Sequence, residues 1–133
     1  MPRWSGLRAQ LLATLALMLA GCAESNRTIV FDTVAAPRGD YTLVALVITP
    51  WFPQGPHQVA LDLIQTADGG TERLIKTSLA YDGVPFTKQN IGLRWTADHS
   101  ALVCLRATDR PDQGVQITVE TGQPTKVQHR HRC

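Results

Sequence analysis

The sequence predicts an all-β fold, a single small β-sandwich or barrel of about seven to eight mostly antiparallel strands after a cleaved signal helix. Two observations predict it. Short segments of alternating or β-branched residues recur along the chain, separated by turns rich in glycine, proline and aspartate. In addition, no apolar pattern with the helical period of about 3.6 residues follows residue 22.

The strand-like segments differ in how many faces they bury. Residues 41–49 are almost all apolar or β-branched, which is typical of a strand buried on both faces. Residues 58–66 alternate, so that Val59, Leu61 and Leu63 share one face. The strands are predicted at 29–34, 41–49, 58–66, 71–81, 90–95, 101–107, 115–120 and, more briefly, near 126–128.

Turn chemistry predicts how some of these strands are connected. Asp68-Gly69-Gly70 is the kind of sequence that favours a type I′ hairpin, and the strand after it has room for a bulge. Asp98-His99 predicts a tight turn, preceded by a strand that points Ile91, Leu93 and Trp95 inward. The fifth, sixth and seventh strands are therefore expected to form a meander.

The N-terminus has the pattern of a secretory signal peptide. Arg3 and Arg8 precede an apolar run from Leu11 to Ala20, which is interrupted only by Thr14. This run is too short to span a bilayer, because a transmembrane helix needs about 20 apolar residues.

The segment Leu19-Ala20-Gly21-Cys22, which closes this signal, resembles the lipobox of bacterial lipoproteins. The resemblance covers the first 22 residues and implies cleavage before Cys22, a diacylglycerol on its sulfur and often a further acyl chain, such as palmitate, on its amine. Two or three chains hold a protein firmly at a membrane, since each buried methylene contributes about 0.8 kcal/mol. Ala23 stands where Asp favours the inner membrane, which implies the periplasmic face of the outer membrane. The alternative is an ordinary signal peptide followed by an unmodified cysteine.

The predicted organisation has four parts. Residues 1–21 are the signal peptide, 22–28 the lipidated cysteine and a short tether, 29–128 the β-sandwich, and 129–133 a basic tail that contains histidine. Cleavage leaves 112 residues, the size of one domain. The mature chain has 11 Lys and Arg against 11 Asp and Glu, because both signal arginines are removed. A balanced charge outside the cytoplasm argues against a nucleic-acid partner.

Two cysteines remain once Cys22 is assigned to lipid. Cys104 and Cys133 form an even pair in a compartment that oxidises thiols, which predicts a disulfide. The bond would close a loop of about 30 residues and stabilise the fold by about 3 to 4 kcal/mol. The alternative is a buried free thiol at Cys104 and a reactive terminal thiol at Cys133.

Two surface features are candidate binding sites. Trp51 and Phe52 lie in a loop that contains three prolines and a glycine, and they either anchor a protein partner or fold back to cap the sandwich. His129 and His131 alternate with Cys133, so an extended tail would give the three side chains one face and a weak potential for zinc or copper. The simpler interpretation is a solvated basic tail that touches anionic lipid head groups. We therefore predict no metal site and no cofactor.

No motif predicts catalysis. Asp98-His99-Ser100 contains the three residue types of a catalytic triad, but adjacent side chains on a turn diverge. We therefore expect a membrane-anchored envelope lipoprotein that is not an enzyme and whose sandwich binds or scaffolds another envelope protein. The alternatives are a periplasmic module that binds a small ligand, a glycan or a metal, an enzyme inhibitor, and a hydrolase whose site forms only in the fold.

Overall fold

The computed structural model describes residues 27–49, 56–79, 87–107 and 109–133. These residues confirm the predicted all-β class, because they form eight strands in two four-stranded sheets. None of the described segments forms a helix long and apolar enough to cross a bilayer. The strands are β1 (Arg27–Ala35), β2 (Tyr41–Thr49), β3 (His57–Gln65), β4 (Thr71–Leu79), β5 (Ile91–Ala97), β6 (Ser100–Leu105), β7 (Gln113–Thr118) and β8 (Lys126–Arg130).

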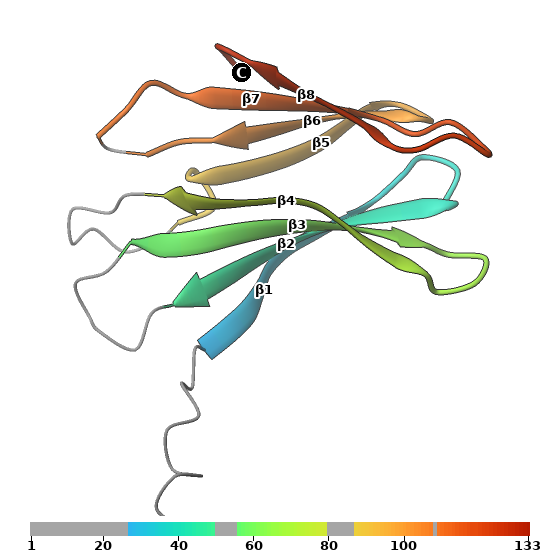
Figure 1. The fold of residues 1–133 in the computed structure, drawn as a ribbon, viewed down its shortest axis with the longest axis horizontal. Coiled ribbons are helices and arrows are strands. Elements are labelled where there is room, and N and C mark those ends of the chain that lie inside the picture. The colour runs from blue at the N-terminus through green and yellow to red at the C-terminus, as the bar shows by residue number, and fades with distance from the viewer. Residues whose placement is uncertain (1–26, 50–55, 80–86, 108) are drawn as a thin grey trace, which may run out of the picture.

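Each sheet is an antiparallel meander in sequence order, β1-β2-β3-β4 in one and β5-β6-β7-β8 in the other (Figure 1). Two separate sheets make the fold a sandwich rather than a barrel. The second sheet contains the predicted meander and extends it by β8. The strands of the sandwich begin at Arg27 and end at Arg130, so the boundaries predicted at residues 29 and 128 move outward by two residues at each end.

Because neighbouring strands run in opposite directions, each connection lies at one of two ends of the sandwich. We call the end where β1 begins and β8 finishes the entry end. The opposite, distal end holds the hairpin turns β1–β2, β3–β4, β5–β6 and β7–β8, which lie at the right in Figure 1. An ion pair between Arg38 and Asp98 (3.5 Å) joins turns of the two sheets there.

The core consists of alternate side chains from the two central strands of each sheet. The predicted inward residues Val59, Leu61 and Leu63 are buried on β3, and Ile91 is buried on β5, while Leu93 and Trp95 pack partly buried against the core. The indole Nε1 of Trp95 also donates a hydrogen bond to the carbonyl of Val34 (3.0 Å), which joins β5 to β1. The other central-strand residues of the core are Leu43, Ala45, Val47, Ala101, Val103, Leu105, Val115 and Ile117.

The prediction that residues 41–49 are buried on both faces is only partly right. Leu43, Ala45 and Val47 point into the core, and Val44 on the opposite face of β2 is also buried, whereas Leu46 and Ile48 on that face are half-buried. The physical reason is that the sandwich has two layers, and no described strand covers the outer face of the first sheet. The β-branched composition here reflects a central strand rather than a third layer.

The connection between β3 and β4 is longer than the type I′ hairpin that its sequence predicted. It contains five residues, 66–70, and among the described residues only glycines have a positive φ. Gly69 takes that conformation (φ 69°), and the Asp68 carboxylate accepts a hydrogen bond from the amide of Gly70 (2.7 Å). The aspartate thus stabilises the turn through its side chain, while a type I′ turn would need two left-handed residues.

The bulge predicted in the fourth strand is present and has an electrostatic consequence. Leu61 pairs with Ile75 and Asp62 pairs with Arg73, so Leu74 is the extra residue. This shift sets the Arg73 guanidinium beside the Asp62 carboxylate on the outer face, where both nitrogens Nε and Nη2 donate to it. The hydrogen bond to Asp62 raises the pKa of Arg73. Asp62 is buried, and the guanidinium provides the hydrogen bonds that its carboxylate would otherwise lose with water.

Replacing a core leucine should test this architecture. Leu61→Ala removes a fully buried side chain, and we expect it to lower the free energy of unfolding by about 2 to 5 kcal/mol. The matched control is Leu102→Ala on the outer face of β6, where the side chain is only half-buried and the loss should be clearly smaller. Urea unfolding measures both. Equal losses would contradict the assignment of inner and outer faces.

Candidate functional site

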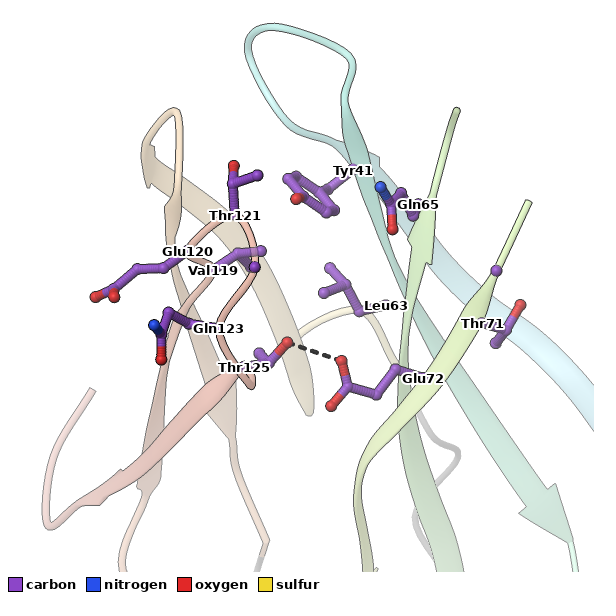
Figure 2. A pocket seen from close by; sticks show the side chains of 12 residues that line it. Tyr41, Leu63, Gln65, Thr71, Glu72, Val119, Glu120, Thr121, Gln123 and Thr125 are labelled. Atoms are coloured by element: carbon purple, nitrogen blue, oxygen red, sulfur yellow. Dashed lines mark hydrogen bonds between the residues drawn. The ribbon is translucent and has the colours of Figure 1, made fainter. Parts of the chain in front are cut away.

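A cavity of about 340 Å³ opens between the two sheets at the distal end (Figure 2). Its lining comes from the start of β2, the β3–β4 hairpin and the β7–β8 turn, three regions far apart in the sequence. The lining residues are Tyr41, Leu63, Gln65, Gly70, Thr71, Glu72, Val119, Glu120, Thr121, Gly122, Gln123 and Thr125.

The cavity has an apolar base and a polar rim. Leu63 and Val119 are buried members of the core, and the half-buried Tyr41 packs against the same cluster. The base is therefore the distal edge of the core itself. Gly122 (φ 74°) turns the chain between β7 and β8, which brings the rim residues of the second sheet opposite those of the first.

One hydrogen bond spans the cavity from sheet to sheet. The Thr125 hydroxyl donates to the Glu72 carboxylate (2.7 Å), and Figure 2 shows both side chains pointing into the gap between the sheets. The Glu120 carboxylate instead points away from Leu63 and pairs with the Lys126 ammonium (3.0 Å). Glu72 is thus the carboxylate positioned to meet a ligand or partner, with Tyr41 and Gln65 on the same side.

The cavity offers hydrogen-bonding groups and one aromatic ring. A carboxylate, two amides and several hydroxyls accept and donate hydrogen bonds, and a tyrosine offers an aromatic face. The three triad residue types at positions 98 to 100 do not converge. Asp98 pairs with Arg38, while the Ser100 hydroxyl accepts a hydrogen bond from the Gln116 amide (3.4 Å).

No sequence motif marks this cavity. Glu72 and Thr125 are 53 residues apart, and no short motif joins them. The available signal was indirect: the predicted turns after the third and seventh strands must lie at one end if the strands alternate in direction. Which side chains meet there depends on how the two sheets stack.

Cys104 and Cys133 lie together on the outer face of the second sheet. Cys104 alternates with the buried Val103 and Leu105, so its side chain points away from the core. The Cys133 thiol donates a hydrogen bond to the carbonyl of Gln113 (3.6 Å) and lies within hydrogen-bonding reach of the Cys104 thiol. The two sulfurs are adjacent but not bonded in this structure, so the predicted disulfide is not formed in it.

The environment of the Cys133 thiol suppresses its ionisation. The residue as a whole is exposed, but its sulfur lies against the sheet, and this partial removal from water raises the pKa of Cys133 to about 11. The hydrogen bond and the charge of Cys104 act in the same direction, and the nearby Arg106 guanidinium opposes them. The thiol form therefore predominates at neutral pH.

Gly114 lets the C-terminal segment reach Cys104. Gly92, Cys104 and Gly114 pair across β5, β6 and β7, so they form one row on the outer face. A Cβ atom at Gly114 would collide with the carbonyl oxygen of Arg132, because the tail crosses the sheet directly above it. Glycine inside a strand often marks such a close approach of another backbone, a signal that the sequence analysis did not use.

The structure places His129 and the terminal thiol on opposite faces of the second sheet, while His131 lines a surface hollow together with His129 and Asp112. His129 pairs with Val115 on the side that faces the first sheet, and it lines a lateral opening with Ile75 and Thr77. Cys133 lies on the outer face instead, because β8 ends at Arg130 and the tail then folds across the sheet. Within the described residues, no three His, Cys, Asp or Glu side chains are placed to hold a metal ion.

The remaining predicted site residues are not described. Cys22, Trp51 and Phe52 lie outside the residues that the structure describes, and their predicted roles stay predictions. Compared with protein-family models, with curated proteins and with solved structures, the chain has no significant match.

The glycine row makes a specific prediction about the tail. Gly114→Ala should displace residues 131–133, expose both thiols of the reduced protein and return the pKa of Cys133 toward its ordinary value. Alkylation at pH 8.5 should then speed up at Cys133 by about tenfold or more, because the thiolate is the reacting species. Peptide mapping by mass spectrometry measures the rate at each cysteine.

The matched control is Gly92→Ala in the same row. Its added methyl would make only ordinary contacts with the Cβ of Cys104 (3.6 Å) and with Arg106, so the alkylation rate should stay at the wild-type value. If both substitutions left the rate unchanged, the tail would not lie across Gly114 in solution.

Proposed function

We propose that this chain is a membrane-anchored, non-catalytic lipoprotein of the cell envelope whose sandwich binds another envelope protein at the distal cavity. The observation that carries the proposal is the placement of chain entry and cavity at opposite ends of the sandwich. β1 contains nine residues and rises about 3.3 Å per residue, so the two ends are about 30 Å apart.

The lipobox resemblance supplies the anchor in this proposal. Cys22 precedes Arg27 by five residues, and an extended chain covers at most about 17 Å over that length. The entry end therefore stays close to the lipid, and the distal cavity faces away from it. A domain with this polarity presents its binding site to other components of the envelope rather than to the bilayer.

The cavity favours a protein segment as the occupant. Glu72 provides a negative charge and Tyr41 an aromatic ring in the same cavity, with the apolar Leu63 between them, which suits a Lys or Arg side chain with its aliphatic stem. Tyrosine is also enriched among residues that dominate the energetics of protein interfaces. We therefore expect the partner to insert a basic or hydroxyl-rich segment at the distal end.

A small polar ligand, such as a glycan, is the second candidate. The observation that favours it is the combination of Tyr41 with the amides and hydroxyls of Gln65, Gln123 and Thr125 around one cavity. Such groups hydrogen-bond sugar hydroxyls while an aromatic face covers the ring. The two candidates differ in whether the occupant is a macromolecule.

In the oxidising compartment that the proposal implies, we expect a disulfide between Cys104 and Cys133. The support is the adjacency of the two thiols on the outer face. The bond would hold the C-terminal tail across the second sheet. By the lipobox resemblance, Ala23 supports an anchor in the outer membrane with the sandwich on the periplasmic side.

Intact-mass spectrometry of the protein purified from its native membrane tests the covalent part of the proposal. The chain should begin at Cys22 and carry the mass of a diacylglycerol, with or without a further acyl chain. Alkylation in denaturant without reductant should add no label, and after reduction it should add two. A mature chain without acyl mass would contradict the anchor, and two labels without reductant would contradict the disulfide.

Photo-crosslinking in intact cells tests the binding part. A photoreactive residue at Gln123, on the cavity rim, should give one discrete crosslinked protein, and the same residue at Gln58 on the far half of the first sheet should not. Glu72→Gln keeps an acceptor for Thr125 but removes the charge, so it should reduce the crosslink several-fold with unchanged thermal stability.

Glu120→Gln is the control for this experiment, because it removes the same charge from a side chain that points away from the cavity. If Gln123 captured no protein and purified glycans raised the melting temperature in a Glu72-dependent way, the second candidate would replace the first. If Glu72→Gln and Glu120→Gln had equal effects, the cavity would be the binding site of neither a protein partner nor a glycan.

A further inference from the structure

We propose that the entry end of the sandwich is a docking surface for an anionic lipid surface. This inference rests on the proposed lipid anchor and adds the orientation in which the anchored domain sits. Three observations carry it: the sorting of charge between the two ends, exposed apolar side chains on β1, and the short chain between Arg27 and Cys22.

Charge is sorted along the strands of the described residues. The entry end combines six basic residues with two acidic ones, whereas the distal end combines two basic residues with five acidic ones. The entry-end residues are Arg27, Lys88, Arg106, Arg110, Arg130 and Arg132 with Asp109 and Asp112. The distal residues are Arg38 and Lys126 with Asp40, Asp68, Glu72, Asp98 and Glu120.

Ion pairs within each end do not cancel the charge difference between the two ends. At the entry end Arg106 pairs with Asp112 (3.2 Å) and Arg110 with Asp109 (3.3 Å). The other four basic residues there are exposed and form no ion pair within the described part of the chain. At the distal end Arg38 and Lys126 each pair with an acid, which leaves an acidic surplus. A basic end is attracted to anionic lipid, and an acidic end is repelled by it.

The first residues of β1 add an apolar component. Ile29 and Val30 are 42% and 64% exposed, and they are the exposed large apolar side chains of the described residues. They lie two and three residues from the start of the strand and project to opposite faces. Basic residues beside exposed aliphatic groups are the combination that binds at a lipid interface.

The short tether keeps the entry end close to the lipid head groups in the anchored protein. Arg27 lies within about 17 Å of the sulfur of Cys22, so the entry end stays within one or two screening lengths of the head groups, each about 8 to 10 Å. The tail joins the same surface, since Arg132 is held over Gly114 at the entry end of β7.

Vesicle binding by a chain that cannot be acylated tests the proposal. The mature chain from residue 22, with Cys22→Ser, contains both sheets and the whole described core. It should sediment with vesicles of equal parts phosphatidylglycerol and phosphatidylcholine, should not sediment with phosphatidylcholine alone, and should be released by salt.

Two pairs of substitutions with the same net charge locate the surface. Arg130→Gln with Arg132→Gln at the entry end should weaken the partition into anionic vesicles by about 25-fold, since each basic residue near such a surface contributes about fivefold. Arg38→Gln with Lys126→Gln at the distal end should leave it within about twofold. Equal weakening by both pairs would overturn the proposal, because only net charge would then matter.

Binding to heparin, a polyanion without lipid, distinguishes affinity for a lipid surface from affinity for any polyanion. The substitution Val30→Ser tests whether an apolar side chain contributes to vesicle binding. This substitution should weaken vesicle binding several-fold and leave heparin binding unchanged, with circular dichroism confirming the fold. Binding to heparin but not to anionic vesicles would assign the surface to an anionic polymer and overturn the proposal.

Failure of the proposed docking surface and failure of the proposed function can be told apart. A chain without acyl mass in its native membrane would contradict the anchor whatever the vesicles show. Failure to bind anionic vesicles would overturn the docking surface while leaving the anchor and the distal cavity intact.

Discussion

The structure depends on the burial of one face of each sheet against the other. Alternate residues of the central strands supply this core, and Leu43, Leu61, Val103 and Ile117 are fully buried in it. Side chains alternate between the two faces of each strand, so every second side chain lies outside the core. The outer faces therefore carry the Asp62–Arg73 ion pair and the two cysteines. Because the strands are antiparallel and run the length of the sandwich, every turn lies at one of two ends.

Much of the fold could be predicted from the sequence because the alternation of apolar and polar residues along a strand is a local pattern. It placed Val59, Leu61 and Leu63 inward and indicated seven to eight strands, with room for a bulge in the fourth. The five-residue turn at 66–70 was missed, because Asp68 stabilises it through its side chain rather than through a left-handed backbone. The burial of β2 was partly overestimated, since the same β-branched composition serves a central strand whose outer face is only partly buried.

The candidate sites were harder to predict because they depend on long-range placement. The cavity joins Glu72 to Thr125 only after the two meanders stack. The tail illustrates the opposite case: a disulfide between Cys104 and Cys133 was predicted from the cysteine count, and the structure brings the two thiols together without that bond. The path of the tail required the glycine at position 114. That path also divides His129 from Cys133, so the face that an extended tail would share does not form.

The central claim is that the anchored sandwich stands with its entry end on the membrane and its cavity directed away. Fluorescence quenching by lipids that carry a quencher in the head group tests it most directly, on the acylated protein in anionic bilayers. A fluorophore at Thr28, the second residue of β1 at the entry end, should be strongly quenched. A fluorophore at Thr121, in the distal β7–β8 turn, should not be quenched. Equal quenching at the two positions, or stronger quenching at Thr121, would contradict the account.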